Sequence, residues 1–261
     1  MWAGGSLRLN LSPSLAPLLL NNARAACVET IRDVTVKGKE GQEKVFVGIE
    51  RRVGLCKSED ESEESVRMRL AGSKSGAPGL SEEEFGETSV IERRNIVFMR
   101  EAPKRAARGP EDEKKTKTLD PPAKGDAVEF RHSFTPDSKL LFRYSALTWN
   151  AHAIHLDTAF CRDVEGHRNL LFHGPLSFTL MMTALRHYRL AKDEEVEFVE
   201  YRNLAPLYAG EPLTVAGRQK EEGKYEVWVE TPQGALAVRG LVRTKRVEEK
   251  RRYADLEMLA G

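Results

Sequence analysis

The stretch that decides the fold is PLSFTLMMTALRHY, residues Pro175–Tyr188. Its first three turns are apolar nearly all the way round, and a helix of this composition has to be buried on most sides. The segments after it alternate apolar and polar residues, as in YEVWVE over Tyr225–Glu230, which is typical of strands with one buried face. We therefore predict an α+β fold in which an antiparallel sheet wraps around one long helix.

An internal repeat organises the rest of the chain. Leu15-Ala16-Pro17-Leu18 recurs as Leu204-Ala205-Pro206-Leu207, and three strand-like stretches follow each copy. These stretches are Ala26–Val36, Lys44–Val53 and Ser89–Met99, then Leu213–Arg218, Tyr225–Glu230 and Leu236–Arg243. A match of four residues is weak by itself, so it is the shared order of the strands that favours a true repeat. The two halves are predicted to be similar sheets, and only the second contains a long apolar helix.

Composition narrows the class of protein. Lys+Arg number 41 and Asp+Glu 40, so the net charge of +1 gives no electrostatic case for nucleic acid or an anionic membrane as a partner. Cys27, Cys56 and Cys161 are odd in number and lack a CxxC spacing, which predicts reduced thiols instead of disulfides or a zinc site. No apolar run approaches the roughly 18 residues that a transmembrane helix needs. We expect a soluble protein.

Two polar segments set the expected domain boundaries. Residues 58–87 contain an acidic run and almost no aliphatic periodicity, so we predict a disordered acidic insert within an N-terminal domain at 1–103. Residues 104–126 carry charged clusters around a Pro-Pro pair and are predicted to be a linker. A catalytic domain at 127–248 and a charged tail at 249–261 complete this division.

The densest group of polar residues is YSALTWNAHAIHLD, Tyr144–Asp157, followed after a short gap by Phe172-His173-Gly174-Pro175. This pair of motifs resembles the MaoC-like (R)-specific enoyl-CoA hydratases, which have a Ser-x-Leu-Thr segment, then Asn-Pro-x-His-x-Asp, then His-Gly before a central helix. The resemblance covers about 130–246 and implies a hot-dog fold, with the antiparallel sheet wrapped round the buried helix. It also implies a lyase that adds or removes water across the double bond of an acyl thioester, without metal or cofactor.

One position departs from the bacterial pattern. The acid five residues before the histidine is replaced by Asn150, and an amide cannot act as a general base. The string Asn-x-His-x-Ile-His-x-Asp is similar instead to the branch of mitochondrial type 2 hydroxyacyl-thioester dehydratases and mesaconyl-CoA hydratase-like proteins, which join two hot-dog halves. The resemblance thus implies a double hot dog and a mitochondrial location; without it, the expectation is a cytoplasmic protein.

The resemblance assigns roles by position. His155 matches the catalytic histidine, and imidazole can accept or donate a proton near neutral pH. Gly174 matches the residue whose backbone N–H, at the start of a helix, holds the thioester carbonyl. Asn150 would orient water or substrate through hydrogen bonds. Four further residues are candidates for substrate binding: Asp157, His173, His152 and Ser145. Asp157 is equally suited to capping a helix, and a structural role is favoured for His152.

Two other functions stay open at this point. Because Asn150 replaces the acid, the chain could be a catalytically silent hot-dog protein that binds acyl thioesters or serves as a subunit. A thioester hydrolase is the weaker alternative. Expected partners are an acyl-CoA or acyl carrier protein thioester, together with a homodimer or pairing of the two halves within one chain.

The N-terminal residues allow two interpretations. Met1–Val28 contain arginines but no acid before Glu29, as organellar transit peptides do, whereas the repeat indicates that they are already folded domain. Leu15 lies too close to Met1 for a leading strand and a central helix. We therefore expect an incomplete hot dog, with an apolar face covered by an upstream extension, which we favour, or by another chain or the C-terminal domain.

Overall fold

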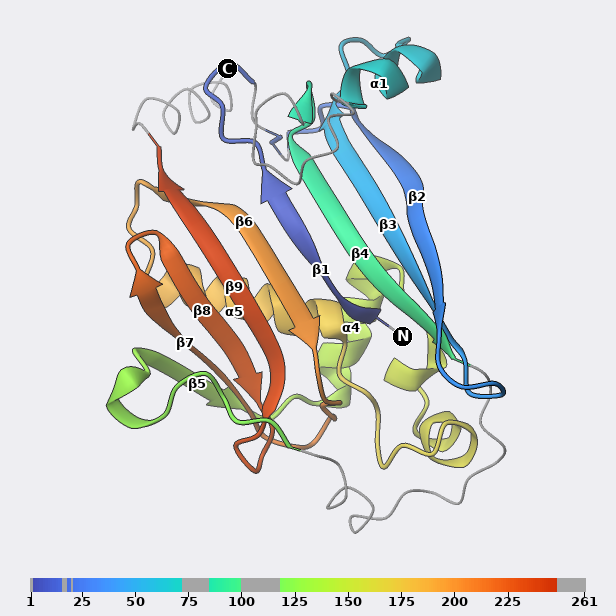
Figure 1. Cartoon of the computed structure of the whole chain (residues 1–261), viewed down its shortest axis with the longest axis vertical. Helices are drawn as coiled ribbons and strands as arrows, with labels where there is room; N and C mark the ends of the chain where they lie inside the picture. Colours follow the sequence, from blue (N-terminus) through green and yellow to red (C-terminus); the bar gives the residue numbers. More distant parts are fainter. Residues whose placement is uncertain (1, 16–17, 20, 72–84, 100–117, 248–261) are drawn as a thin grey trace.

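The computed structural model describes residues 2–15, 18–19, 21–71, 85–99 and 118–247. Its strands form one antiparallel sheet of nine, in the order β2-β3-β4-β1-β6-β9-β8-β7-β5 (Figure 1). The strands are β1 Trp2–Leu9, β2 Ala25–Lys37, β3 Lys44–Leu55, β4 Val90–Met99, β5 Phe130–Phe134, β6 Glu194–Asn203, β7 Leu213–Glu221, β8 Lys224–Glu230 and β9 Leu236–Arg246. An α+β fold built on an antiparallel sheet is therefore confirmed.

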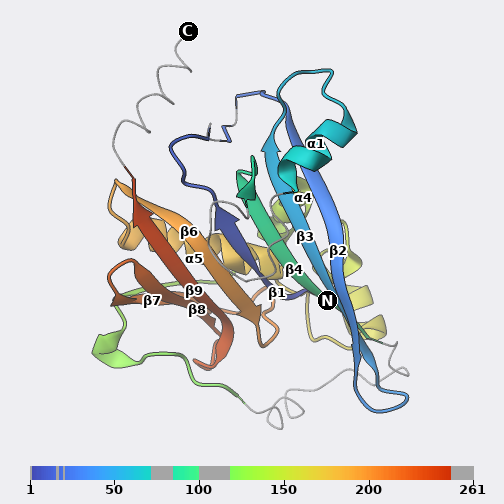
Figure 2. The same cartoon turned by 45° about the horizontal axis from the view of Figure 1, so that its top comes forward.

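The sheet has an approximate twofold arrangement that follows the repeat. In each half, the strand before the Leu-Ala-Pro-Leu copy, β1 or β6, lies at the centre of the sheet. The three strands after each copy then run outward in reverse chain order, so β4-β3-β2 mirrors β9-β8-β7. The halves meet where β1 pairs with β6, from Gly4 opposite Arg202 to Arg8 opposite Phe198 (Figure 2). Residues Trp2–Leu9 are thus part of the folded sheet.

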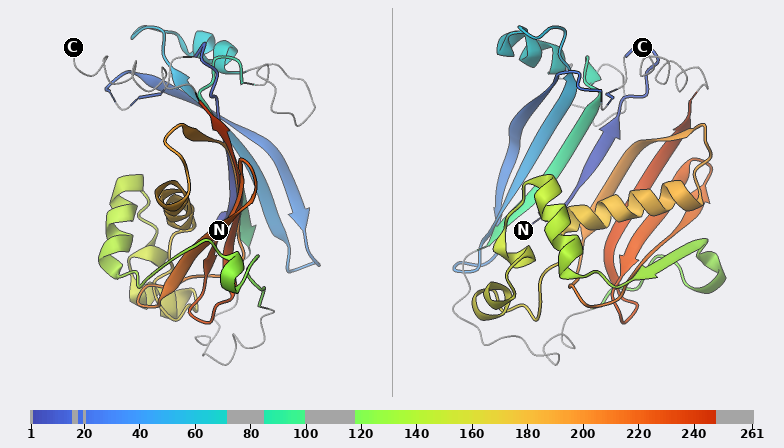
Figure 3. Two further views of the ribbon diagram at one scale, coloured as in Figure 1. Left: turned by 90° about the vertical axis from the view of Figure 1, so that its left-hand side faces the viewer. Right: turned by 180° about the vertical axis from the view of Figure 1, so that it is seen from behind.

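One long helix, α5 (Gly174–Tyr188), crosses one face of the C-terminal half of the sheet (Figure 3). Met181 and Leu185 of this helix are completely buried. They belong to a core that includes Val199, Val215 and Val227 from the strands. At about 25 cal/mol per Å² of apolar surface, burying side chains of this size stabilises the fold by about 1.5–3 kcal/mol each.

The opposite face of this half is covered by residues 118–129. The carbonyl of Leu119 accepts a hydrogen bond of 2.8 Å from the backbone N–H of Leu236. Ala123 is buried against Trp228, whose side chain has no exposed surface. The linker prediction is therefore wrong for residues 118–126, because this segment covers an apolar patch that the outward-facing Trp228 creates.

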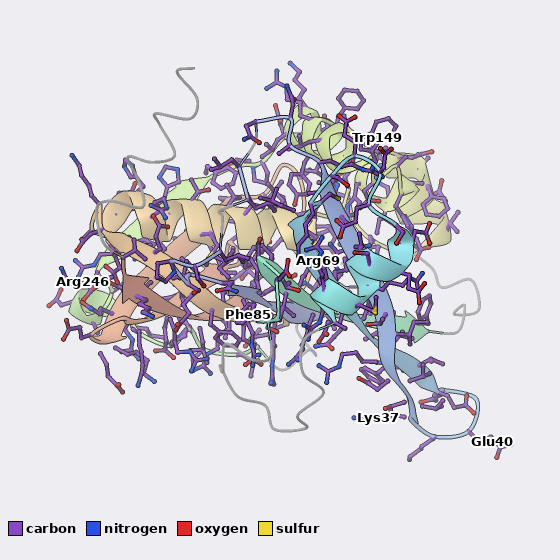
Figure 4. The ribbon with its side chains drawn as sticks, turned by 90° about the horizontal axis from the view of Figure 1, so that it is seen from above. Lys37, Glu40, Arg69, Phe85, Trp149 and Arg246 are labelled. Carbon is purple, nitrogen blue, oxygen red and sulfur yellow. The ribbon has the colours of Figure 1, made fainter. Side chains whose placement is uncertain are left out.

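The predicted insert at 58–87 also contains structure. Residues Glu63–Leu70 form the helix α1, capped by Ser62, whose hydroxyl accepts the N–H of Ser65. Leu70 is fully buried. Its side chain packs so closely against Gly54 that a Cβ on that glycine would lie only 2.6 Å from a methyl carbon of Leu70. Figure 4 shows α1, with Arg69 labelled, over the end of the sheet. The prediction of disorder is therefore wrong for this helix, because one buried leucine anchors it.

An ion-pair network also holds α1. Arg69 donates to both Glu61 and Glu87, with N–O distances of 2.7 and 2.9 Å. These contacts use an acid of the run that the sequence alone predicted to be solvated. Residues 72–84 of the insert and the tail at 249–261 lie outside the described residues. Within the described ranges, no helix is long and apolar enough to cross a membrane.

The N-terminal half leaves an apolar surface uncovered. The edge strand β2 exposes Ile31, Val34 and Val36 by 69%, 59% and 62%. Strand registers place these residues on the same face of the sheet that α5 covers in the other half. Among residues 2–99 that the structure describes, no helix equivalent to α5 lies on this face.

Candidate active site

The segment with the predicted site residues begins in a helix. Helix α4 (Ser138–Thr148) starts at Asp137, whose carboxylate accepts the N–H of Leu140 at 2.8 Å. It ends at Trp149, which takes a left-handed conformation with φ 53°. Tyr144 and Ser145 therefore lie in the last turns of α4. The end of α4 lies beside the start of α5 (Figure 3).

His155 ends the short 3-10 helix η2 (Ala153–His155) and is 8% exposed. Its Nδ1 lies 2.8 Å from the carbonyl oxygen of Leu171. Because a carbonyl only accepts, Nδ1 carries the hydrogen and the lone pair of the neutral ring is on Nε2. Burial lowers the pKa of His155, and nearby His152 acts in the same direction, although the bond to Leu171 opposes both. The arrangement gives His155 an unprotonated Nε2, as a general base requires.

His173 stacks directly on His155. The ring centroids are 3.6 Å apart and the ring planes differ by 19°. His173 is 1% exposed, and its Nε2 lies 2.9 Å from the hydroxyl oxygen of Ser145, which is also buried. Burial, and secondly the neighbouring His155, lower the pKa of His173 to about 3. His173 and Ser145, both predicted to contact substrate, are therefore enclosed behind His155, and His173 is neutral near pH 7.

Gly174 is the first residue of α5, and the backbone N–H groups of a first helical turn have no carbonyl partner in their own helix. The structure adds a reason for glycine that the sequence did not reveal. A Cβ at this position would lie 2.6 Å from Nδ2 of Asn203, at the end of β6. In the sequence, Asn203 is distinguished only by its position directly before the second Leu-Ala-Pro-Leu copy.

The other predicted site residues make local contacts with the backbone. Asn150 accepts from the N–H of His152 at 3.3 Å through its amide oxygen. His152 is exposed, and its Nδ1 accepts the N–H of Ile154 at 3.2 Å. Asp157 accepts the N–H of Phe160 at 3.0 Å, which is the capping contact considered as its alternative role. These three side chains shape the turn around His155.

The thiol of Cys161 donates to the carbonyl of Ile154 at 2.9 Å, and burial raises its pKa, so it packs as a thiol behind η2. Across the described ranges, no three or more His, Cys, Asp or Glu side chains are arranged to hold a metal. Cavities of about 600 and 380 Å³ lie elsewhere, beside Cys56 and Phe98, and no residue of the His155 cluster lines them.

Two known proteins are similar to part of this sequence. The mesaconyl-C(4)-CoA hydratase of Chloroflexus aurantiacus is 36% identical over 107 residues, which are 41% of this chain and 37% of the relative. The mitochondrial type 2 hydroxyacyl-thioester dehydratase of Schizosaccharomyces pombe is 35% identical over 82 residues, 31% of this chain and 27% of the relative. The matched segments thus span well under half of the length of either relative.

Solved structures match over most of the chain. The peroxisomal multifunctional enzyme type 2 of Drosophila melanogaster superposes with a TM-score of 0.62 and 12% identity, over 94% of this chain and 37% of that one. A MaoC-like dehydratase from Phytophthora capsici gives 0.60 and 13%, over 95% and 72%. At these identities the likeness shows the fold, which is that of the MaoC-like hot-dog proteins.

The family of type 2 hydroxyacyl-thioester dehydratases matches residues 77–209, which include His155, His173 and Gly174. This match covers half of the sequence and contains the whole cluster described above. The chain therefore belongs to the type 2 hydroxyacyl-thioester dehydratase family.

Proposed function

We propose that this chain is a hydro-lyase that adds and removes water across the α,β double bond of an acyl thioester. The observation that carries the proposal is the fixed tautomer of His155, whose Nδ1 donates to the carbonyl of Leu171. This leaves Nε2 ready to accept a proton, and His155 lies near the first turn of α5 because its ring stacks on His173, the residue just before that helix. The named relatives, a hydratase and dehydratases of acyl thioesters, support the same reaction class.

Each part of the site has a step in hydration. His155 Nε2 takes a proton from water as the water oxygen bonds to the β carbon, and the electron pair of the double bond moves toward the thioester carbonyl. The N–H of Gly174 and the dipole of α5 stabilise the enolate-like oxygen. The imidazolium then gives its proton to the α carbon, which completes the addition. Asn150 orients the water or the substrate through its amide N–H, since its oxygen already accepts from His152.

The substrate is a thioester of coenzyme A or of acyl carrier protein, and the reaction needs no metal or cofactor. Two relatives are named as mitochondrial, which supports that location for this chain. The mirrored order of strands on either side of β1 and β6 supports a double hot dog formed within one chain. In this arrangement the described part of residues 2–99 has no central helix, and its exposed β2 face leaves room for a homodimer contact.

The test is an assay for hydration of crotonyl-CoA, which is measured as the loss of absorbance of the conjugated thioester. We expect His155→Ala to lower turnover by about 10²–10⁴-fold, the usual contribution of one positioned acid or base. His187→Ala, which changes an exposed histidine on α5, is the matched control and should keep full turnover.

Asn150, in place of the acid, favours one second candidate, a catalytically silent thioester-binding protein. Binding of crotonyl-CoA without turnover, in a folded wild-type chain, would support it and overturn the lyase. Release of free coenzyme A thiol would instead indicate a hydrolase.

A further inference from the structure

A histidine at position 173 destabilises the fold relative to an apolar residue. Its ring is buried, yet within the described residues Nδ1 has no hydrogen-bond partner. A buried polar atom without a partner destabilises the fold, so a hydrocarbon ring of similar shape would be the more stable choice. Packing alone therefore does not account for an imidazole here.

Its contacts point toward His155. One hydrogen bond to the Leu171 carbonyl fixes a single atom of the His155 ring and leaves the ring free to tilt about that bond. The parallel ring of His173, at a centroid distance of 3.6 Å, blocks the tilt on one side. His173 is itself fixed by Ser145 at 2.9 Å and by the edge of Tyr144, with centroids 5.0 Å apart. A continuous chain of contacts thus runs from α4 to His155.

We propose that His173 is a positioning residue for the reaction, holding the imidazole of His155 at the angle needed for proton transfer and excluding water from behind it. The inference rests on the proposed function, because it deepens the role of the same site. Positioning matters at this scale, since a displacement of about 1 Å at a catalytic group can cost about 10²-fold in rate.

The groups that face this pair define what pH measurements can report. They are His152 just before η2, Tyr144 on α4 and Cys161 on η3 (Phe160–Val164), while Glu92 and Arg94 of β4 act on Tyr144. None of them pairs with His155 as an ion, and burial is the main cause of its low pKa. If His173 is removed and water enters, the pKa of His155 should rise.

The experiment compares His173→Ala with His173→Phe, which keeps a ring in the stack. For His173→Ala we expect kcat to fall about 10–100-fold with KM within about threefold, and the acid limb of kcat/KM to move to higher pH. His173→Phe should keep kcat within about fivefold and leave the acid limb in place. Equal losses in both variants, or unchanged kcat in His173→Ala, would overturn the proposal.

A second measurement does not need activity. Nitrogen NMR of the histidine rings should show one sharp set of signals for an Nδ1-protonated His155 in the wild type and in His173→Phe. The same signals should broaden in His173→Ala, where the ring can tilt relative to the Leu171 carbonyl. Ser145→Ala removes only the anchor and should broaden the same signals, which keeps the test available if His173→Ala does not fold. An inactive wild type with a fixed tautomer would refute the proposed function alone, whereas unchanged signals in both Ser145→Ala and His173→Ala would refute the positioning role.

Discussion

The buried histidine predicts how the stability of this protein depends on pH. The pKa of His173 falls from its ordinary 6.5 to about 3 in the folded chain, mainly because of burial. Below pH 6.5, His173 therefore binds a proton in the unfolded chain, whereas in the folded chain it stays neutral down to about pH 3. The free energy of unfolding must then fall as the pH falls through this window, by about 1.4 kcal/mol for each pH unit. Between about pH 7 and pH 5 the loss due to His173 is about 2 kcal/mol.

The other described groups with shifted pKa values either add to the fall in this pH window or act at lower or higher pH. His155 also has a lowered pKa and adds a loss of the same sign. Although burial works against ionisation of Glu50, its hydrogen bonds to Arg93 and Arg52 hold the pKa of this carboxyl below 4.5. The stability that its ion pairs supply is therefore lost only at lower pH. A loss of about 2 kcal/mol is a large part of the 5–15 kcal/mol that stabilises most domains.

The assay is urea unfolding followed by circular dichroism at several pH values between about 7 and 5. In His173→Phe the ring is kept but cannot bind a proton, so the fall in unfolding free energy should shrink by about 2 kcal/mol over this range. His187→Phe, at an exposed position of the same helix, should keep the wild-type slope. An identical slope in wild type and His173→Phe would refute the reasoning, because it would mean that His173 is protonated as easily in the folded chain as in the unfolded one.

Three further predictions concern single side chains. Gly174→Ala should lower both the melting temperature and the turnover, because the added Cβ would lie 2.6 Å from the amide of Asn203; unchanged melting would show that Asn203 yields freely. Asn150→Asp should keep the melting temperature, since a carboxylate can accept the same N–H of His152. It should raise the rate of crotonyl-CoA hydration by restoring an acid. A loss of turnover beyond about tenfold at equal stability would show that the amide N–H is required. Leu70→Ala should cost about 2–5 kcal/mol in urea unfolding, because its fully buried side chain anchors α1 beside Gly54; a cost below about 0.5 kcal/mol would mean that α1 is not part of the cooperative unit.

The sequence by itself determined the local elements and the main chemical candidate. Apolar, β-branched stretches, several of them with period-two alternation, identified β2, β3, β4, β7, β8 and β9. The apolar composition of Pro175–Tyr188 identified α5 to within one residue. The spacing of Asn150, His155 and Gly174 supported the family resemblance, which agrees with the match over 77–209.

Only the tertiary structure decided which of these elements meet. Nothing in the local pattern shows that β1 pairs with β6, because pairing depends on which edges come together in space. The same holds for His155 and His173, which are eighteen residues apart and stack only because Leu171 and Ser145 fix both rings. Likewise, the acidic region forms α1 because Leu70 fills a space beside Gly54 on a distant strand, and such long-range fit leaves no periodic signal along the chain.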